Sequence, residues 1–228
     1  MGCTNCALNG TNTPLYGPLR PDFVVVGEAP GPKEVKENRP FVGPAGTLLR
    51  KLMADAALDP ERALWINTVS CFPNDAGKIR PPTSEESTAC RPNLDLQLAA
   101  SGVQYALLVG AKALNAFRSD LAITKHHGQV FIWRERYCVM PIIHPAAVLR
   151  GNPDYANHIR TDLQRWRDIV YGGDDPTLLV GDGCARCGHP AQSWDRDGVP
   201  YCKEHWGRFK NQWLKDRTTK PDQLSFEA

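Results

Sequence analysis

The nine residues FVVVGEAPG, at positions 23–31, carry the clearest indication of how this chain folds. The apolar run Phe23 to Val26 predicts a buried strand, and the glycines and proline that follow predict a sharp turn. In open α/β sheets, ligands bind beyond the carboxyl ends of the strands. Glu28 therefore stands where a carboxylate can orient water or stabilise a developing cation. A solvated Glu in a tight turn is the plainer interpretation.

Apolar runs alternate with amphipathic segments along the following 140 residues or so. Further strands are predicted over 64–69 and 105–109, and 129–133 is expected to pair with 137–143. Helices are predicted over 46–57, after the capping-box sequence at 83–86, from about Ala111, and over 154–170. This alternation predicts an α/β fold with helices on both faces of a mainly parallel sheet.

The domain organisation follows from a change in composition near Gly172. We expect one domain over 1–171, a linker over 172–182, a small module over 183–212 and a polar tail over 213–228. The module has the spacing C-x2-C-x14-C-x2-H, which resembles a small zinc finger. Its predicted Zn²⁺ ligands are Cys184, Cys187, Cys202 and His205.

Composition and charge limit the possible classes of protein. The formal net charge is only +2 in 228 residues, which neither requires nor excludes a nucleic-acid partner. We expect no membrane span, because no apolar run reaches 18 residues. A secretory signal is not recognisable at the N-terminus, so a cytoplasmic protein is expected. We also expect the protein to be monomeric. The eight cysteines then suggest metal sites rather than disulfides.

Three further segments offer side chains for a ligand site. Phe41, in a loop rich in Gly and Pro, can stack on a base or simply fill the core. Asn67, at a strand end, can read the polar edge of a pyrimidine or serve in a turn. In HPAAVLR, His144 can donate to a leaving base and Arg150 can hold a phosphate. Lys78 and Arg80 are further candidates for phosphate contacts.

Four other cysteines form a second candidate metal set: Cys3, Cys6, Cys71 and Cys90. Four thiolates suit a [4Fe–4S] cluster or structural zinc, and their spacing does not choose between these. Cys71 and Cys90 could also be buried thiols without a metal. Cys138 lies in an apolar strand and is assigned to the core.

Taken together, these segments resemble the family 4 uracil-DNA glycosylases over about residues 1–170. The motifs that carry the resemblance are CTNC, GEAPG, RPFVGPAGTLL, NTVSC, the later Cys90 and HPAAVLR. The resemblance implies a three-layer α/β/α sandwich and a DNA partner. It also implies a [4Fe–4S] cluster on Cys3, Cys6, Cys71 and Cys90.

The resemblance also implies a role for each residue of the pocket. Glu28 would act on the water or the sugar cation, and His144 would stabilise the charge of the departing base. Phe41 would stack on that base and Asn67 would read its edge. The residues on either side of Glu28, Gly27 and Ala29, are expected to border the base. Because no lysine in these motifs is placed as a nucleophile, a monofunctional enzyme is expected.

The resemblance is incomplete in the loop after GEAPG, where Val35 and Asn38 replace an expected acid and glycine. In that family this loop borders the ring edge on which thymine carries its methyl group, so the base specificity is open. Uracil is the default substrate. One alternative is a defence enzyme that removes a modified base, such as glucosylated 5-hydroxymethylcytosine, from phage DNA. Another is a catalytically silent DNA-binding protein.

Overall fold

A computed structural model describes residues 5–8, 13–75, 78–134 and 136–172, together with the backbone of 193–194 and 200–201. Within these residues, a five-stranded sheet has the order β2-β1-β5-β7-β6. Its strands are β1 (Phe23–Gly27), β2 (Ala63–Asn67), β5 (Tyr105–Val109), β6 (Phe131–Trp133) and β7 (Tyr137–Ile142). All neighbouring pairs are parallel except β6–β7, which is antiparallel.

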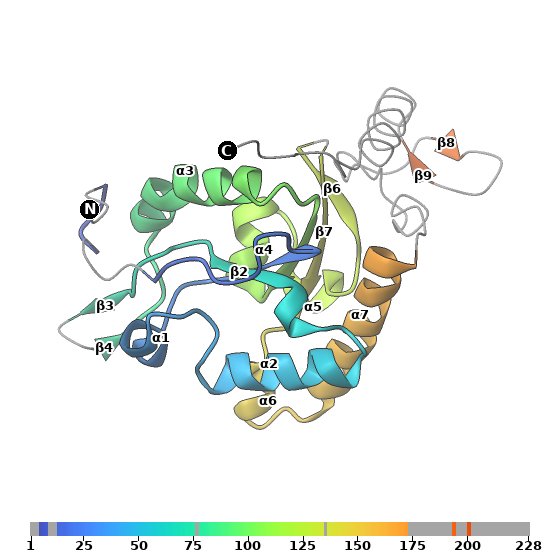
Figure 1. Ribbon diagram of the computed structural model, residues 1–228, viewed down its shortest axis with the longest axis horizontal. Coiled ribbons are helices and arrows are strands. Elements are labelled where there is room, and N and C mark those ends of the chain that lie inside the picture. Colours follow the sequence, from blue (N-terminus) through green and yellow to red (C-terminus); the bar gives the residue numbers. More distant parts are fainter. Residues whose placement is uncertain are drawn as a thin grey trace, which may run out of the picture.

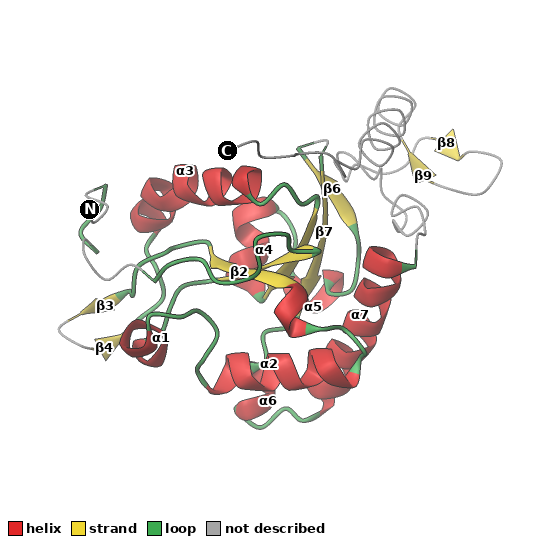
Figure 2. Cartoon of the chain, in the orientation of Figure 1, coloured by secondary structure: helices red, strands yellow, loops and turns green. Residues whose placement is uncertain are grey.

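Helices cover both faces of this sheet, with α3 on one side and α2 and α7 on the other (Figure 1). The longer helices are α2 (Pro44–Asp55), α3 (Ser84–Ala100), α4 (Ala111–Phe117) and α7 (Asp154–Tyr171). The short ones are α1 (Pro32–Glu37), α5 (Ile123–His126), α6 (Ala146–Leu149) and the 3₁₀ turn η1 (Pro60–Arg62). Figure 2 shows the resulting layers by secondary structure.

The side chains of β1 explain why both faces must be covered. Phe23 and Val25 belong to the apolar core beneath α2 and α7. Val24 and Val26 belong to the core on the opposite face, with residues of α3 and α4. Successive side chains of a strand point to opposite faces, so four consecutive apolar residues require a helix layer on each side. The predicted three-layer α/β/α fold is confirmed.

Several boundaries differ from the sequence-based expectations. The second strand ends at Asn67 rather than Val69, because the backbone N–H groups of Thr68 and Val69 turn to the carbonyls of Gly27 and Glu28. Neither the short helix α1 nor the two-stranded hairpin of β3 (Asn74–Asp75) and β4 (Lys78–Ile79) was expected.

The expected C-terminal module falls almost entirely outside the described residues. Within 183–212, the structure gives only the antiparallel backbone pair of β8 (Ser193–Trp194) and β9 (Pro200–Tyr201). The linker, the module and the tail therefore remain predictions. Among the helices of the described ranges, none combines the length and apolar character that crossing a bilayer requires.

Candidate active site

A pocket of about 360 Å³ opens at the carboxyl edge of the sheet. One side, here called the sheet wall, consists of residues that follow β1 and β7: Glu28, Ala29, Pro30, Gly31 and His144. The opposite side, here called the hairpin wall, consists of residues in and around β3–β4: Pro73, Ile79, Arg80, Pro81 and Pro82. Two motifs that are more than 100 residues apart thus contribute Glu28 and His144 to the same pocket.

The position of Glu28 follows from the pairing of β1 with β2. Their parallel register puts Gly27 opposite Asn67, so both strands end side by side. The turn after Gly27 is held by backbone hydrogen bonds, in which the N–H of Thr68 donates to Gly27 O (2.9 Å) and that of Val69 to Glu28 O (3.0 Å). The carboxylate is therefore carried by a backbone that the residues after β2 hold in place.

Gly27 is the point at which the proposed base-binding side chains meet. A Cβ at this position would lie 2.6 Å from Cζ of Phe41 and would collide with Oδ1 of Asn67. Asn67 is 8% exposed. Phe41 and Asn67 are not among the residues that line the pocket; they converge behind Glu28 on the bare Cα of Gly27. Only glycine leaves space for both groups there.

Phe41 combines a structural contact with an unusual backbone. Its ring lies 4.9 Å from that of Trp65 and packs on the core from a partly buried position. Its φ of +57° falls in the left-handed region, which is costly for a bulky residue. Such strained residues cluster at functional sites. The core-filling role considered from the sequence is therefore present, and Phe41 fills it with a positive φ.

Glu34 connects the GEAPG turn to the loop that carries Phe41, and sequence reasoning did not single it out. Its carboxylate accepts hydrogen bonds from the backbone N–H groups of Gly31 (3.1 Å) and Gly43 (2.7 Å). One side chain of α1 thus ties together the two loops of the site. The spacing from Gly31 to Glu34, that of a helix-capping acid, is the sequence signal that could have found it.

His144 follows β7 and is held by two backbone features. Gly110, at the end of β5, donates its N–H to Ile142 O (2.9 Å) and has a φ of +88°. A Cβ on Gly110 would approach Cβ of His144 to 2.9 Å, so the two strand ends touch here. The N–H of Ala146 donates to Nδ1 of His144 (3.1 Å). In the neutral imidazole, the proton is therefore on Nε2.

Burial shifts the titration of both groups. It raises the pKa of the Glu28 carboxyl, while the positive charge of Lys112 acts in the opposite direction. It lowers the pKa of His144, and the charge of Arg150 lowers that pKa further. His144 is therefore favoured as a neutral Nε2–H donor. Lys112 is a second residue that sequence reasoning missed, because it lies on α4, outside every motif.

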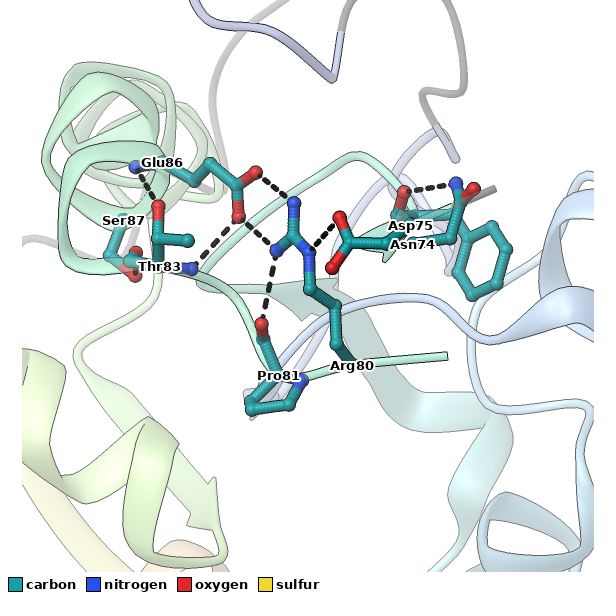
Figure 3. A network of polar contacts seen from close by, with 8 residues as sticks. Asn74, Asp75, Arg80, Pro81, Thr83, Glu86 and Ser87 are labelled. Carbon is teal, nitrogen blue, oxygen red and sulfur yellow. Dashed lines mark hydrogen bonds and ion pairs between the residues drawn. The ribbon is translucent and has the colours of Figure 1, made fainter. Parts of the chain in front are cut away.

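The hairpin wall depends on the guanidinium of Arg80 (Figure 3). Its two terminal nitrogens bind the carboxylate of Glu86 at 2.8 and 2.6 Å, and Nε binds Asp75 at 2.8 Å. Glu86, which is 5% exposed, also accepts from the backbone N–H of Thr83 (2.8 Å) in the capping box of α3. The ion pair with Arg80 holds the pKa of Glu86 below its ordinary value.

The residues predicted to contact phosphate therefore differ in their availability. Arg80 directs its hydrogen bonds to Glu86, Asp75 and the carbonyl of Pro81, which gives it a structural task. Lys78, in the same hairpin, and Arg150, at the end of α6, are exposed. For those two, a phosphate contact remains a prediction.

Three of the four cysteines expected at an iron–sulfur cluster come together. Cys6, Cys71 and Cys90 pack with Leu8 and Val69 in one small apolar group. The backbone N–H of Ser70 donates to Sγ of Cys90 (3.3 Å). Among the described residues, no group of three or more His, Cys, Asp or Glu side chains is arranged so that it could hold a metal ion, and these three thiols are no exception. Cys3 lies outside the described residues, as do Cys184, Cys187, Cys202 and His205.

Comparison with known proteins agrees with this arrangement. The profile of the uracil DNA glycosylase superfamily matches residues 14–165, which include the whole sheet and both walls of the pocket. The chain belongs to this superfamily and is a DNA glycosylase, a hydrolase of N-glycosyl bonds.

Characterised relatives give a narrower placement. The chain is 36% identical to the type-4 uracil-DNA glycosylase of Thermotoga maritima, over 74% of this chain and 89% of the relative. It is 33% identical to that of Archaeoglobus fulgidus (78% and 93% covered) and 32% identical to that of Sulfurisphaera tokodaii (75% and 81% covered). Its similarity is therefore to the type-4 enzymes, and DNA is the implied partner.

Proposed function

We propose that this enzyme extrudes uracil from DNA and hydrolyses its N-glycosidic bond, leaving an abasic site. The observation that carries the proposal is that Glu28 and His144 line one pocket, although their motifs lie at the ends of different strands. The three relatives described above are named as type-4 uracil-DNA glycosylases, and this name describes the same reaction. Base-excising enzymes must extrude the nucleotide, because its reacting bond is inaccessible within the duplex.

The chemistry requires opposite charges to be stabilised at two places. Breaking the bond leaves positive charge on the sugar and negative charge on the base, as in other glycoside hydrolysis. The Glu28 carboxylate can stabilise the sugar cation and accept a proton from the attacking water. The Nε2–H of His144 can donate to a carbonyl oxygen of the departing base. Groups fixed in advance at such positions lower the barrier most effectively.

Recognition of the base is assigned to the residues that meet at Gly27. The amide of Asn67 offers both donors and an acceptor to the pyrimidine edge, and the ring of Phe41 offers a stacking face. Ala29 completes the turn beside the base. A monofunctional enzyme is part of the proposal, because the sequence motifs of the site carry no lysine placed as an amine nucleophile.

A [4Fe–4S] cluster is proposed on Cys3, Cys6, Cys71 and Cys90. The support is the convergence of the last three thiols and the N–H group that donates to Cys90. Thiolates of this kind are the usual ligands of such clusters. When bound, the cluster would link three parts of the chain: the N-terminal segment through Cys3 and Cys6, the segment between β2 and β3 through Cys71, and α3 through Cys90. Zinc in the C-terminal module remains a prediction from its spacing.

The test is release of the base from a panel of oligonucleotides containing uracil, 5-hydroxymethylcytosine or glucosylated 5-hydroxymethylcytosine, with abasic sites as the readout. We expect cleavage at uracil. Cleavage only at a modified base would show that the enzyme removes modified bases, as the defence alternative states. No cleavage at all would favour the catalytically silent DNA-binding protein.

Variants separate the chemistry from the fold. Glu28→Ala should reduce excision by about 10²–10³-fold, as expected for loss of one preorganised charge. The matched control is Glu37→Ala, which removes an exposed carboxylate from the neighbouring helix α1. Iron analysis and visible absorption of both variants should equal those of the unaltered enzyme. Full activity in Glu28→Ala would contradict the assignment.

A further inference from the structure

We propose that Arg39 and Arg50 form a binding site for a backbone phosphate of DNA, beside the loop that carries Phe41. This inference deepens the proposed function and rests on it, because it assumes that the pocket receives a nucleotide from a DNA strand. Neither arginine was among the phosphate contacts expected from the sequence. The site would hold the strand next to the pocket and would take no part in the chemical step.

Arg39 is distinguished by the lack of an acceptor for its guanidinium. Among the described residues, no carboxylate, amide or carbonyl oxygen accepts a hydrogen bond from this group, which stacks on the ring of Tyr16 with Cζ 3.7 Å from the ring centre. Every other half-buried arginine in these ranges donates to such an oxygen. The group that would complete Arg39 is therefore an anion.

Arg50 brings a second guanidinium to the same place. It lies over the ring of Trp65, 4.1 Å from the ring centre, and its Nη1 donates to Glu61 (3.1 Å). Burial lowers the pKa of Arg50, the Glu61 carboxylate opposes this effect, and the positive charge of Arg39 lowers the pKa further. The two guanidiniums are thus close enough to repel each other. Within the described ranges the pair has one ion-pair partner, Glu61, whose side chain is 64% exposed.

The hydrogen-bonding capacity of this arginine pair is not filled. Nε of Arg39 and Nη2 of Arg50 are buried without a partner among the described residues, and unpaired buried donors are uncommon in folded proteins. The pair nevertheless stays accessible, since Arg39 is half-buried and the Arg50 side chain is 19% exposed. A bound anion would offset the repulsion and supply acceptors. Planar guanidinium groups suit phosphate because their donors can bind two of its oxygens.

Direct contacts join the arginine pair to the base-binding residues. Arg39 stands two residues before Phe41 in the same loop. The ring of Trp65, which lies against Arg50, also packs on the Phe41 ring at 4.9 Å. Phe41 in turn reaches Gly27, directly before the pocket. We therefore assign the phosphate to the strand that carries the extruded nucleotide, where such a contact fixes the position of the backbone.

The first experiment measures binding of a duplex with a tetrahydrofuran abasic nucleotide over a series of salt concentrations. Each phosphate contact contributes about 0.9 to the slope of log K against log salt concentration. We expect Arg39→Gln to reduce that slope by about 1, and the affinity at about 0.1 M salt by roughly 5–10-fold. Arg39→Lys keeps the charge and should keep the slope. An unchanged slope in Arg39→Gln would overturn the proposal.

The matched control is Arg136→Gln. Arg136 also lies over a tyrosine ring, that of Tyr137 at 5.3 Å, but it precedes β7 and so stands at the edge of the sheet opposite His144. Its loss should leave both the slope and the affinity unchanged. An equal reduction in Arg136→Gln would show a general effect of net charge, and would contradict a specific site.

A gain of affinity provides a test that misfolding cannot imitate. Glu61→Gln removes the carboxylate that pairs with Arg50, so DNA binding should tighten by about two- to fivefold, the equivalent of one exposed ion pair. The control Asp120→Asn removes an exposed carboxylate that pairs with Arg118 at the end of α4, and should have little effect. Unchanged or weaker binding by Glu61→Gln would contradict the proposal.

The second experiment identifies the phosphate. Single uncharged methylphosphonate linkages replace one phosphate at a time on each side of the abasic nucleotide and in the complementary strand. We expect one position in the abasic strand to weaken binding by the unaltered enzyme but not by Arg39→Gln, in which the contact is already lost. Equal effects in both proteins at every position would overturn the assignment, as would a sensitive position found only in the complementary strand.

These binding measurements do not depend on which base is excised. If the unaltered enzyme released no uracil, the proposed substrate would be wrong, but the salt slopes and the methylphosphonate positions would still decide for or against the phosphate site. Inorganic phosphate is the remaining probe. If it raised the Tm of the unaltered enzyme but not of Arg39→Gln, while both bound DNA with the same salt slope, the pair would bind a free anion and the DNA contact would be refuted.

Discussion

The sheet wall and the hairpin wall of the pocket are positioned by different interactions. Glu28 and His144 follow buried parallel strands, so their backbones are fixed by the sheet register and by apolar cores on both faces. The hairpin wall consists of two-residue strands, and its principal attachment is the ion pair between Arg80 and Glu86. The proposed reacting groups therefore belong to the part of the pocket that the sheet holds in place, whereas the hairpin wall depends on one ion pair.

The largest effect should come from the sheet wall. His144→Ala removes the Nε2–H donor that we propose for the departing base, and we expect kcat to fall by about 10²–10³-fold. The measurement is single-turnover excision of uracil, with DNA affinity determined in parallel on an abasic duplex. His126→Ala, on the surface helix α5, is the matched control. A loss confined to DNA affinity would make His144 a binding residue and would remove the distinction between the two walls.

A second prediction concerns the space at Gly27. Gly27→Ala places a methyl group within 2.6 Å of Phe41 and against the amide of Asn67, so both must shift. We expect roughly 10–100-fold lower excision, since small misplacements of positioned groups are costly, and a stability loss of about 1–3 kcal/mol from overpacking. Rate measurements and denaturant unfolding would check both. An active, fully stable variant would show that the base does not bind at this point.

A smaller effect is expected from the attachment of the hairpin. Glu86→Gln removes the charge that holds Arg80, and we expect kcat/KM on duplex DNA to fall by roughly tenfold or less, because the reacting groups stay in place. The control is Asp120→Asn, which weakens a comparable but exposed pair with Arg118 at the end of α4. If Glu86→Gln lowered activity as much as His144→Ala, the two walls would be equally important to the chemistry.

The smallest effect is one of stability and pH. Burial raises the pKa of Glu28. At neutral pH the ionised carboxylate therefore lowers the free energy of unfolding, because it is desolvated in the folded state and hydrated in the unfolded state. Glu28→Gln should therefore raise Tm at pH 7 by about 1–2 °C, a small value because the group is partly exposed. The gain should vanish as the pH falls below the ordinary carboxyl range, where Glu28 is protonated in both states. Thermal unfolding at several pH values would check this, and a constant gain would contradict it.

The sheet could be predicted from the sequence because each strand shows itself in its own run of apolar residues. The run Phe23 to Val26 is apolar at every position, and this predicts both a strand and its cover on two faces. Glu28, Asn67 and His144 could be identified for a related reason, since Glu28 and His144 follow recognisable strands and Asn67 is the last residue of one. The capping box of Thr83 and Glu86 was likewise predicted from the spacing of its residues.

The remaining parts of the site depend on contacts between distant residues. A sequence pattern does not show that the carboxylate of Glu34 bridges to Gly43, or that Lys112 influences Glu28. Arg80 was expected to contact a phosphate because it is a basic residue in the segment between Cys71 and Cys90. The structure shows instead that the Arg80 guanidinium binds Glu86 and Asp75. These contacts depend on how the hairpin packs against α3, which local propensity does not determine.

The shared carboxylate of Glu86 has a consequence for local unfolding. It accepts from the first turn of α3 and from the hairpin at once, so fraying of that turn releases both structures together. The helix start and the mouth of the pocket therefore form one cooperative unit with a single opening free energy. Once the intrinsic exchange rate of each amide is allowed for, the amide protons of these two segments should report the same opening free energy, even though one segment is helical and the other is extended.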